Sequence, residues 1–254
     1  MTKAASSRAE LSLKTTQSSS VPRSICVLIP ALNEVENIEA TVEAVGRALS
    51  QTTDDFEIII VNDGSTDGTK EIADRLGAET PRIRVFHNER NKGIGHAYRT
   101  GYENARCEYF VYIPADNTWP YESCRQLFAH LGRADIVTSY AVNPEIRPLG
   151  RRIFSSLYTR CINLIFGRNM RYYNGLNIYP VSFLRSEPIN TVGFGFQAEI
   201  LLRALAAGLT HIEVGLPIGE RAAGRSKATS LRNILDVVAT VLRLAWYLRV
   251  RRRS

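Results

Sequence analysis

The stretch ICVLIPALNE at residues 25–34 is followed by a second one of the same kind, FEIIIVNDGSTDG, at residues 56–68. Each is a short apolar run, rich in Ile and Val, that ends abruptly in polar residues. Such runs are typical of strands that are buried on both faces of a parallel sheet. Open α/β sheets bind their ligands outside the carboxyl ends of the strands. We therefore expect a binding site among the polar residues that follow these two strands.

Strand-like and helix-like segments alternate from here to about residue 139, which predicts right-handed crossovers and a mostly parallel sheet flanked by helices. Less regular segments follow up to residue 229. We expect one α/β domain over residues 24–229, because no repeat or second domain is evident. The predicted strands are 56–61, 83–86, 109–113, 135–139 and 212–214, with a strand-like turn at 172–179. The predicted helices are 35–50, 67–76 with Gly77 as its stop, 93–105, 121–131, 151–166 and 194–207.

The net charge of +7 favours an anionic partner, such as nucleic acid, a membrane surface or a phosphate-bearing ligand. Nucleic acid is the weakest of these, because the arginine run RVRRR at 249–253 is terminal and no platform of interleaved aromatic and basic residues accompanies it. We expect no secretory signal and no transmembrane helix, since no run of about 18 apolar residues exists. The widely spaced cysteines predict buried, reduced thiols and a cytoplasmic protein. They are Cys26, Cys107, Cys124 and Cys161.

Four motifs in order give the chain a family resemblance. They are PALNE at 30–34, VNDGSTDGT at 61–69, NKGIGHA at 91–97 and RAAGRSK at 221–227. Together they resemble the inverting glycosyltransferases of family two, which have the GT-A (Rossmann-like) fold. The last two motifs are similar to the branch that makes dolichyl- or polyprenyl-phosphate mannose and glucose. The resemblance spans residues 24–235 and implies transfer of a hexose from a nucleotide sugar to a polyprenyl phosphate.

For the nucleotide-sugar donor, the resemblance implies that Asp63 holds the nucleoside, because a carboxylate accepts paired hydrogen bonds from a base or ribose. The local alternative is that Asp63 and Gly64 only make a turn. Ser65 can likewise bind the donor or cap the following helix. The remaining residues expected to line the donor pocket are Pro30, Ala31, Asn33, Glu34, Gly64 and Ala115.

The segment 91–95 resembles a phosphate-approach loop before a helix. Glycines such as Gly93 let backbone N–H groups come close to phosphate oxygens, and a helix start favours anions. Lys92 is either a ligand of the diphosphate or an ordinary surface lysine. A G-x-G spacing alone is weak evidence, so this assignment depends on the family resemblance.

Asp116 is the predicted metal ligand. The family usually has two aspartates in a D-x-D pattern that hold Mg²⁺ or Mn²⁺ beneath the diphosphate. Here the pattern is Pro114-Ala115-Asp116, so the first aspartate is missing. One carboxylate together with substrate phosphates is enough for Mg²⁺, which keeps several waters. A weakened or metal-independent site is the alternative.

Arg221 and Lys227 are expected to bind phosphate, by a forked guanidinium and a point charge respectively. A lipid phosphate needs no general base, since its second pKa is about 6. A hydroxyl acceptor does need one, and Glu199 would then be the base. Glu199 can instead be a partner of the loop arginines. Two further hypotheses stay open: transfer to a hydroxyl acceptor, and a non-catalytic nucleotide-sugar binder.

The two ends of the chain are expected to differ from the domain. Residues 1–23 are polar and rich in Ser and Thr, which predicts a disordered segment. Residues 230–254 predict an amphipathic helix and a basic tail. This helix either packs on the domain or lies in a membrane interface, with its arginines at anionic headgroups. A lipid acceptor favours the second interpretation, with the protein peripheral on the cytoplasmic face of a membrane.

Overall fold

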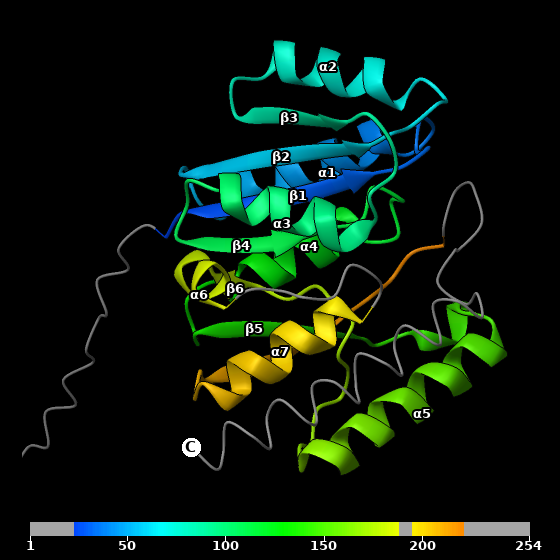
Figure 1. Cartoon of the computed structure of the whole chain (residues 1–254), viewed down its shortest axis with the longest axis vertical. Helices are drawn as coiled ribbons and strands as arrows, with labels where there is room; N and C mark the ends of the chain where they lie inside the picture. Colours follow the sequence, from blue (N-terminus) through cyan, green and yellow to red (C-terminus); the bar gives the residue numbers. More distant parts are fainter. Residues whose placement is uncertain (1–22, 188–194, 221–254) are drawn as a thin grey trace, which may run out of the picture.

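A five-stranded sheet forms the centre of the computed structural model, which describes residues 23–187 and 195–220 (Figure 1). Its strands are β1 (Ile25–Ala31), β2 (Phe56–Asp63), β3 (Ile83–Asn88), β4 (Tyr109–Tyr112) and β6 (Tyr179–Pro180). The strand order is β3-β2-β1-β4-β6, and only β6 runs antiparallel to its neighbour. The mostly parallel central sheet that the alternating pattern predicts is therefore confirmed.

Helices cover both faces of this sheet (Figure 1). They are α1 (Ile38–Ser50), α2 (Thr69–Glu79), α3 (Ile94–Asn104), α4 (Tyr121–Phe128) and α7 (Phe196–Ala206). Alternate residues of β1 supply the two cores: Ile25 and Val27 belong to the cluster with α1 and α4, whereas Cys26 and Leu28 belong to the cluster with α3 and α7. A strand buried on both faces explains why the run at 25–31 is continuously apolar.

Two strands form a separate small sheet. They are β5 (Ile136–Ala141) and β7 (His211–Leu216), which pair in parallel. One antiparallel bridge, between Val137 and Ile178, connects β5 to the segment before β6. The predicted strand-like turn at 172–179 is thus mostly irregular. The remaining helices are the short η1 (Pro144–Ile146), α5 (Leu149–Phe166) and α6 (Val181–Ser186).

Gly77 does not end its helix, contrary to the prediction. Helix α2 continues through it to Glu79. A Cβ atom at Gly77 would lie 2.8 Å from Cγ2 of Val85 in β3. The glycine therefore permits close packing of α2 on the edge strand, which is a tertiary requirement that local sequence does not reveal.

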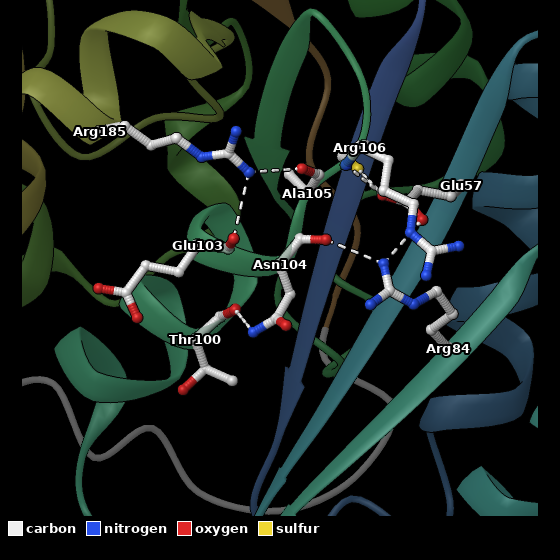
Figure 2. Close-up of polar contacts among 9 residues, drawn as sticks. Glu57, Arg84, Thr100, Glu103, Asn104, Ala105, Arg106 and Arg185 are labelled. Atoms are coloured by element: carbon white, nitrogen blue, oxygen red, sulfur yellow. Dashed lines mark hydrogen bonds and ion pairs between the residues drawn. The ribbon is translucent and has the colours of Figure 1, made fainter.

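Arginine side chains hold the carboxyl end of α3 at the amino edge of the sheet (Figure 2). Arg84 donates to the carbonyl oxygen of Asn104 at 2.9 Å and pairs with Glu57 at 3.2 Å. Arg185 donates to the carbonyl of Ala105 at 2.6 Å. The positive guanidinium groups also lie at the negative end of the helix dipole, which is a favourable interaction. These contacts give the amino edge a structural role.

The thiols are less uniformly buried than predicted. Cys26 and Cys124 are buried and Cys107 is partly buried, but Cys161 on α5 is exposed, so the prediction is wrong at that position. The fold also brings Cys26 and Cys107 together beside Glu57. Hydrogen bonding to Cys107, followed by burial, raises the pKa of the Cys26 thiol, which keeps it protonated.

Within the described ranges, no helix has the length and apolar character needed to cross a bilayer. The predicted segments at 1–22 and 230–254 lie outside these ranges, as do Arg221 and Lys227.

Candidate active site

The four loops that follow β1, β2, β3 and β4 lie at one edge of the sheet. Because these strands are parallel and adjacent, their carboxyl ends meet there. Pro30 and Ala31 end β1, and Ala31 is in register with Asn62 near the end of β2. The predicted donor residues of the first two motifs are therefore neighbours in space.

Asn33 and Ser65 join the first two loops. The backbone N–H of Asn33 donates to Oγ of Ser65 at 3.0 Å, and the N–H of Thr66 donates to Oδ1 of Asn33 at 2.9 Å. Asn33 has a positive φ of 55°, which asparagine tolerates better than most residues. The side chain of Asn33 thus holds the two motif loops in a fixed relation.

Asp67 makes a second connection between the same loops. Its Oδ1 accepts from the N–H of Thr69 at 3.1 Å, and its Oδ2 accepts from the N–H of Val35 at 3.3 Å. Burial raises the pKa of Asp67, but the hydrogen bonds from Thr69 and Val35 outweigh it and lower the pKa overall. The N–H of Glu34 donates to Oγ1 of Thr69 at 2.9 Å. The start of α2 is therefore bonded to the PALNE loop.

Asp63 organises the third loop. Its Oδ1 accepts from Nδ2 of Asn88 at 2.8 Å and from the N–H of Lys92 at 2.9 Å. Its Oδ2 accepts from the N–H of Gly93 at 2.9 Å. Only 4% of Asp63 is exposed. An ionised carboxylate has about four lone-pair positions, so one acceptor position remains after these three bonds.

Gly64 lets the third loop pass close to the second. Its φ is +74°, and a Cβ atom there would lie 2.6 Å from the carbonyl carbon of Arg90. Both the backbone conformation and the space therefore require glycine. The turn interpretation and the site interpretation of the Asp63-Gly64 pair are thus compatible, since this turn brings Lys92 and Gly93 to the site.

The fourth loop carries Asp116 and is fixed to α1. Thr41 in α1 donates through Oγ1 to the carbonyl of Ala115 at 3.2 Å and accepts from the N–H of Asn117 at 3.1 Å. Asp116 is half-buried, and its Oδ1 accepts from Oγ1 of Thr118 at 2.7 Å. The same hydroxyl hydrogen is shared with the carbonyl of Asn37, one turn earlier, at 3.0 Å. The Asp116 loop is therefore connected through α1 to the PALNE loop.

The end of β4 brings further groups toward Asp116. Burial, and secondarily the charge of Asp116 and of Tyr172, raise the pKa of Tyr112, while Arg151 acts in the opposite direction. Arg151 belongs to the first turn of α5. Its guanidinium therefore lies close enough to Tyr112 for a charge interaction.

Glu199 is held in a buried ion pair. Its Oε1 lies 2.8 Å from Nη2 of Arg203, and Nη1 of Arg203 lies 3.3 Å from Oε2 of Glu187. Glu199 is 4% exposed. Phe196, one turn earlier in α7, packs on Tyr98 and Tyr112 with ring centroids 4.9 Å and 6.0 Å apart. Glu199 is thus near the site but bonded to Arg203, an arginine of its own helix.

Two places in the described structure carry side chains that could bind a metal ion, and the oxygen ligand at Asp116 is the better match for a hard divalent cation. In the part of the chain that the structure describes, the one group of three or more ligand-type side chains is Cys26, Glu57 and Cys107. This group lies at the amino edge, and its thiols favour soft metals. A carboxylate at Asp116 with substrate phosphates matches the oxygen preference of Mg²⁺ and Mn²⁺.

Comparison with known proteins places these loops in a family context. The family model described as Glycosyl transferase family 2 matches residues 26–190. Glycosyltransferase AglD of Haloferax volcanii is 31% identical over 240 residues, which cover 90% of this chain and 38% of AglD. The chain thus spans little more than a third of that relative's length.

Two relatives match over most of both chains. Undecaprenyl-phosphate mannosyltransferase of Micrococcus luteus is 29% identical, covering 80% of this chain and 86% of its own. Polyprenol monophosphomannose synthase of Mycolicibacterium smegmatis is 30% identical, covering 84% of each.

A solved structure shares the fold. It is glucosyl-3-phosphoglycerate synthase of Mycobacterium tuberculosis in complex with Mn²⁺, UDP and glucosyl-3-phosphoglycerate. The TM-score is 0.67 at 21% identity, covering 88% of this chain and 80% of that one. At this identity the likeness concerns the fold alone.

Proposed function

The chain belongs to glycosyl transferase family 2 and has the GT-A fold, and from that premise we propose an inverting hexosyltransferase that uses polyprenyl or dolichyl phosphate as acceptor. The donor is a nucleoside-diphosphate sugar of the GDP-mannose or UDP-glucose type. The names of the two relatives that match over most of this chain support a lipid phosphate acceptor. The observation that carries the proposal is the bonded network of four loops at the carboxyl edge, where such sheets bind ligands.

The donor would lie across these loops, with the nucleoside on the Asp63 side. The free acceptor position of Asp63 suits a donor group of the base or ribose. The diphosphate would approach the N-terminus of α3, where the backbone at Lys92 and Gly93 is already held by Asp63. Pro30, Ala31, Asn33 and Glu34 would line the nucleoside side. Asp116 and Ala115 would face the sugar diphosphate.

Asp116 would hold a Mg²⁺ or Mn²⁺ ion, which when bound neutralises the charge that grows on the departing diphosphate. The structure named above binds Mn²⁺ together with UDP, which supports a divalent cation in proteins of this fold. Arg221 and Lys227 are proposed to bind phosphate from outside the described residues.

In the chemical step, an oxygen of the lipid phosphate attacks the anomeric carbon of the sugar. The bond from that carbon to the diphosphate oxygen breaks on the opposite face, the nucleoside diphosphate leaves, and the configuration inverts. No proton has to be removed from the nucleophile, because a phosphate monoester is largely ionised at pH 7.

The position of Glu199 favours a phosphate acceptor over a hydroxyl acceptor. A general base must reach the proton that it removes. The Glu199 carboxylate is instead buried and bonded to Arg203. We therefore propose Glu199 as a residue that positions α7 beside Tyr112, and not as the base.

A transfer assay tests the proposal. The full chain is incubated with radiolabelled GDP-mannose or UDP-glucose, Mg²⁺ and a short-chain polyprenyl phosphate, and label is counted in the organic extract. One donor should give an acid-labile lipid product of inverted configuration. Nucleotide-sugar binding by calorimetry without transfer from any donor would favour the non-catalytic alternative.

Two substitutions test the proposed roles of Asp116 and Glu199 in the same assay. Asp116→Asn should lower the transfer rate by about a hundredfold, as expected for loss of a group that stabilises charge in the transition state. Asp54→Asn, at an exposed loop position, is the matched control and should keep the rate. Glu199→Gln should lower the rate by less than about tenfold. Loss of all transfer in a folded Glu199→Gln protein would instead show that the Glu199 carboxylate takes part in the reaction and does more than position α7.

The domain and the segment that follows it are proposed to have different roles. Residues 24–229 are proposed as the catalytic domain and residues 230–254 as an amphipathic helix with a basic tail. The protein would work as a peripheral protein on the cytoplasmic face of a membrane, where a lipid phosphate is presented.

A further inference from the structure

The exposed large apolar side chains of the described residues lie in one short part of the chain, between Val142 and Ile165. On α5 they include Leu164, which is 86% exposed, and Leu149, which is 65% exposed. Scattered exposed apolar residues are ordinary on a protein surface, but a contiguous set marks an interaction surface. The remaining members are Ile146, Ile153, Phe154 and Leu157.

These side chains lie on one side of α5. Leu149, Ile153, Leu157, Cys161 and Ile165 recur at every fourth residue, so each contacts the next along a row that winds slowly around this side of the helix. Thr159 and Ile162 are the buried residues of this helix and lie on a different face. In Figure 1, α5 lies at the far end of the molecule from α2, outside the layers that cover the central sheet. The helix thus turns an apolar face away from the rest of the described structure.

The charges on α5 are all of one sign. The sequence of Leu149–Phe166 contains Arg151, Arg152 and Arg160 and no Asp or Glu. Arg147 precedes the helix, and Arg168 and Arg171 follow it. An apolar helix face bordered by arginines is the pattern of a helix that lies in the plane of a membrane interface. Arginines near an anionic surface add to the affinity, and no carboxylate within α5 opposes them.

We propose that α5 is a membrane-docking helix, with Leu149, Ile153, Leu157 and Leu164 in the interface of an anionic phospholipid bilayer. A second copy of the chain fits this face less well. Two copies of α5 packed face to face would bring arginines together without a carboxylate in either helix to offset them. A bilayer with anionic headgroups supplies both the apolar layer and the opposite charge.

Helix α5 begins close to the candidate active site, so membrane docking of α5 would also place that site near the membrane. Arg147 donates to the hydroxyl of Tyr172 at 3.3 Å, and Arg151 acts electrostatically on Tyr112 together with Asp116. The start of the helix is therefore next to the end of β4. Docking would hold the Asp116 loop near the headgroups, where a lipid phosphate acceptor is presented. This consequence rests on the proposed function, whereas the docking itself does not.

The exposed Cys161 on the proposed membrane face permits a direct test. The full chain with Cys107→Ser is labelled at Cys161 with an environment-sensitive nitrobenzoxadiazole dye, since Cys26 and Cys124 are buried. Vesicles of phosphatidylcholine mixed with phosphatidylglycerol should shift the emission to the blue and protect the dye from dithionite. A Cys161→Ser protein carried through the same labelling shows how much signal comes from elsewhere.

Several results would overturn the docking. One is vesicle binding, seen by sedimentation, that leaves the dye spectrum unchanged, since another part of the chain would then carry the binding. A dye that is already protected without vesicles would show that the protein itself covers this face. A shift that depends on protein concentration alone would show a second copy.

A pair of variants gives a second measurement. Leu157→Glu with Leu164→Glu should weaken partition into the anionic vesicles by about tenfold or more, because two apolar side chains leave the interface. Lys70→Glu changes the net charge equally, from the exposed surface of α2, and should weaken it far less. Equal losses in the two proteins would mean that net charge alone drives binding.

The same variants separate this inference from the proposed function. Leu157→Glu with Leu164→Glu should keep transfer to a short-chain acceptor in solution and lose transfer to a long-chain acceptor in vesicles. If the parent protein transfers no sugar to any acceptor while the dye still shifts, the proposed function fails and the docking stands. If the variants lose vesicle binding but keep transfer in vesicles, the docking stands and its consequence for the site is wrong.

Discussion

Two adjacent residues, Asp63 and Gly64, account for much of the geometry of the candidate site. The carboxylate accepts one hydrogen bond from Asn88 at the end of β3 and two from the loop that follows, and the glycine leaves room for that loop to pass. A buried carboxylate with such bonds contributes more than a neutral acceptor would, since hydrogen bonds to charged groups are worth about 1.5–3 kcal/mol. The site therefore depends on a contact between distant motifs.

Gly64→Ala should destabilise the protein and abolish donor binding. The added Cβ atom would lie 2.6 Å from the backbone of Arg90 at a positive φ, which costs about 1–3 kcal/mol or more. Urea unfolding and calorimetry with GDP and UDP measure the two effects. Gly46→Ala is the control: nothing lies within 4 Å of its Cβ position in α1, so it should raise stability by about 0.5–1 kcal/mol. Equal behaviour of the two variants would refute this account of Gly64.

For individual residues, the sequence predicted the members of the candidate site better than the hydrogen bonds between them. The motif residues of the first three loops do lie together. Thr41 and Asn88 were missed, because their partners are far along the chain and no local pattern marks them. The Glu199–Arg203 pair had a readable signal, since residues four apart on a helix face one another.

Among the helices, α2 is attached to the site through Asp67. The lowered pKa of Asp67 means that its charged form is more stable in the folded state. This stabilisation is complete above the ordinary value of 3.8 and is lost as the pH falls through the lower folded-state value.

Asp67→Asn should therefore make the free energy of unfolding less dependent on pH under acidic conditions. Between about pH 2 and pH 5, the unfolding free energy of the parent protein should fall more steeply than that of the variant. Chemical unfolding at several pH values measures both slopes. Asp54→Asn, which removes a carboxylate from an exposed position, should leave the slope nearly as it is in the parent. A variant slope as steep as that of the parent would argue against a role for Asp67.

Helix α7 depends on a buried arginine. Arg203→Ala would leave Glu199 and Glu187 without their shared cation, and such losses cost about 3–5 kcal/mol. Arg75→Ala removes a similar pair of contacts, to Glu39 and Glu79, from the exposed surface of α1 and α2. It should destabilise the protein far less, because exposed ion pairs are screened by solvent. Urea unfolding compares the two, and a smaller loss for Arg203→Ala would contradict the burial argument.

Helix and strand positions were predictable where a strong period is present, and their ends were not. The helix predicted at 93–105 is observed as Ile94–Asn104, whereas Gly77 did not end α2. The separation of β5 and β7 from the central sheet was also not predicted. Such features depend on packing between distant segments, and an apolar strand gives no local sign of which sheet it joins.

Across the whole molecule, the two edges of the central sheet have different characters. The amino edge is closed by arginines that bond the end of α3 (Figure 2). The carboxyl edge carries the motif loops, which are bonded to one another and to α1. Because open α/β sheets bind ligands at this edge, it is where we propose that a nucleotide sugar binds.

Hydrogen–deuterium exchange of the full chain with and without GDP or UDP plus Mg²⁺ tests this placement most directly. The nucleotide should slow exchange in residues 31–37, 62–69, 88–94 and 114–119 together, since these segments are coupled by the observed hydrogen bonds. The amino edge around residues 103–107 should be unchanged. Slower exchange at the amino edge, with none in residues 62–69 and 88–94, would contradict the assignment of the donor site.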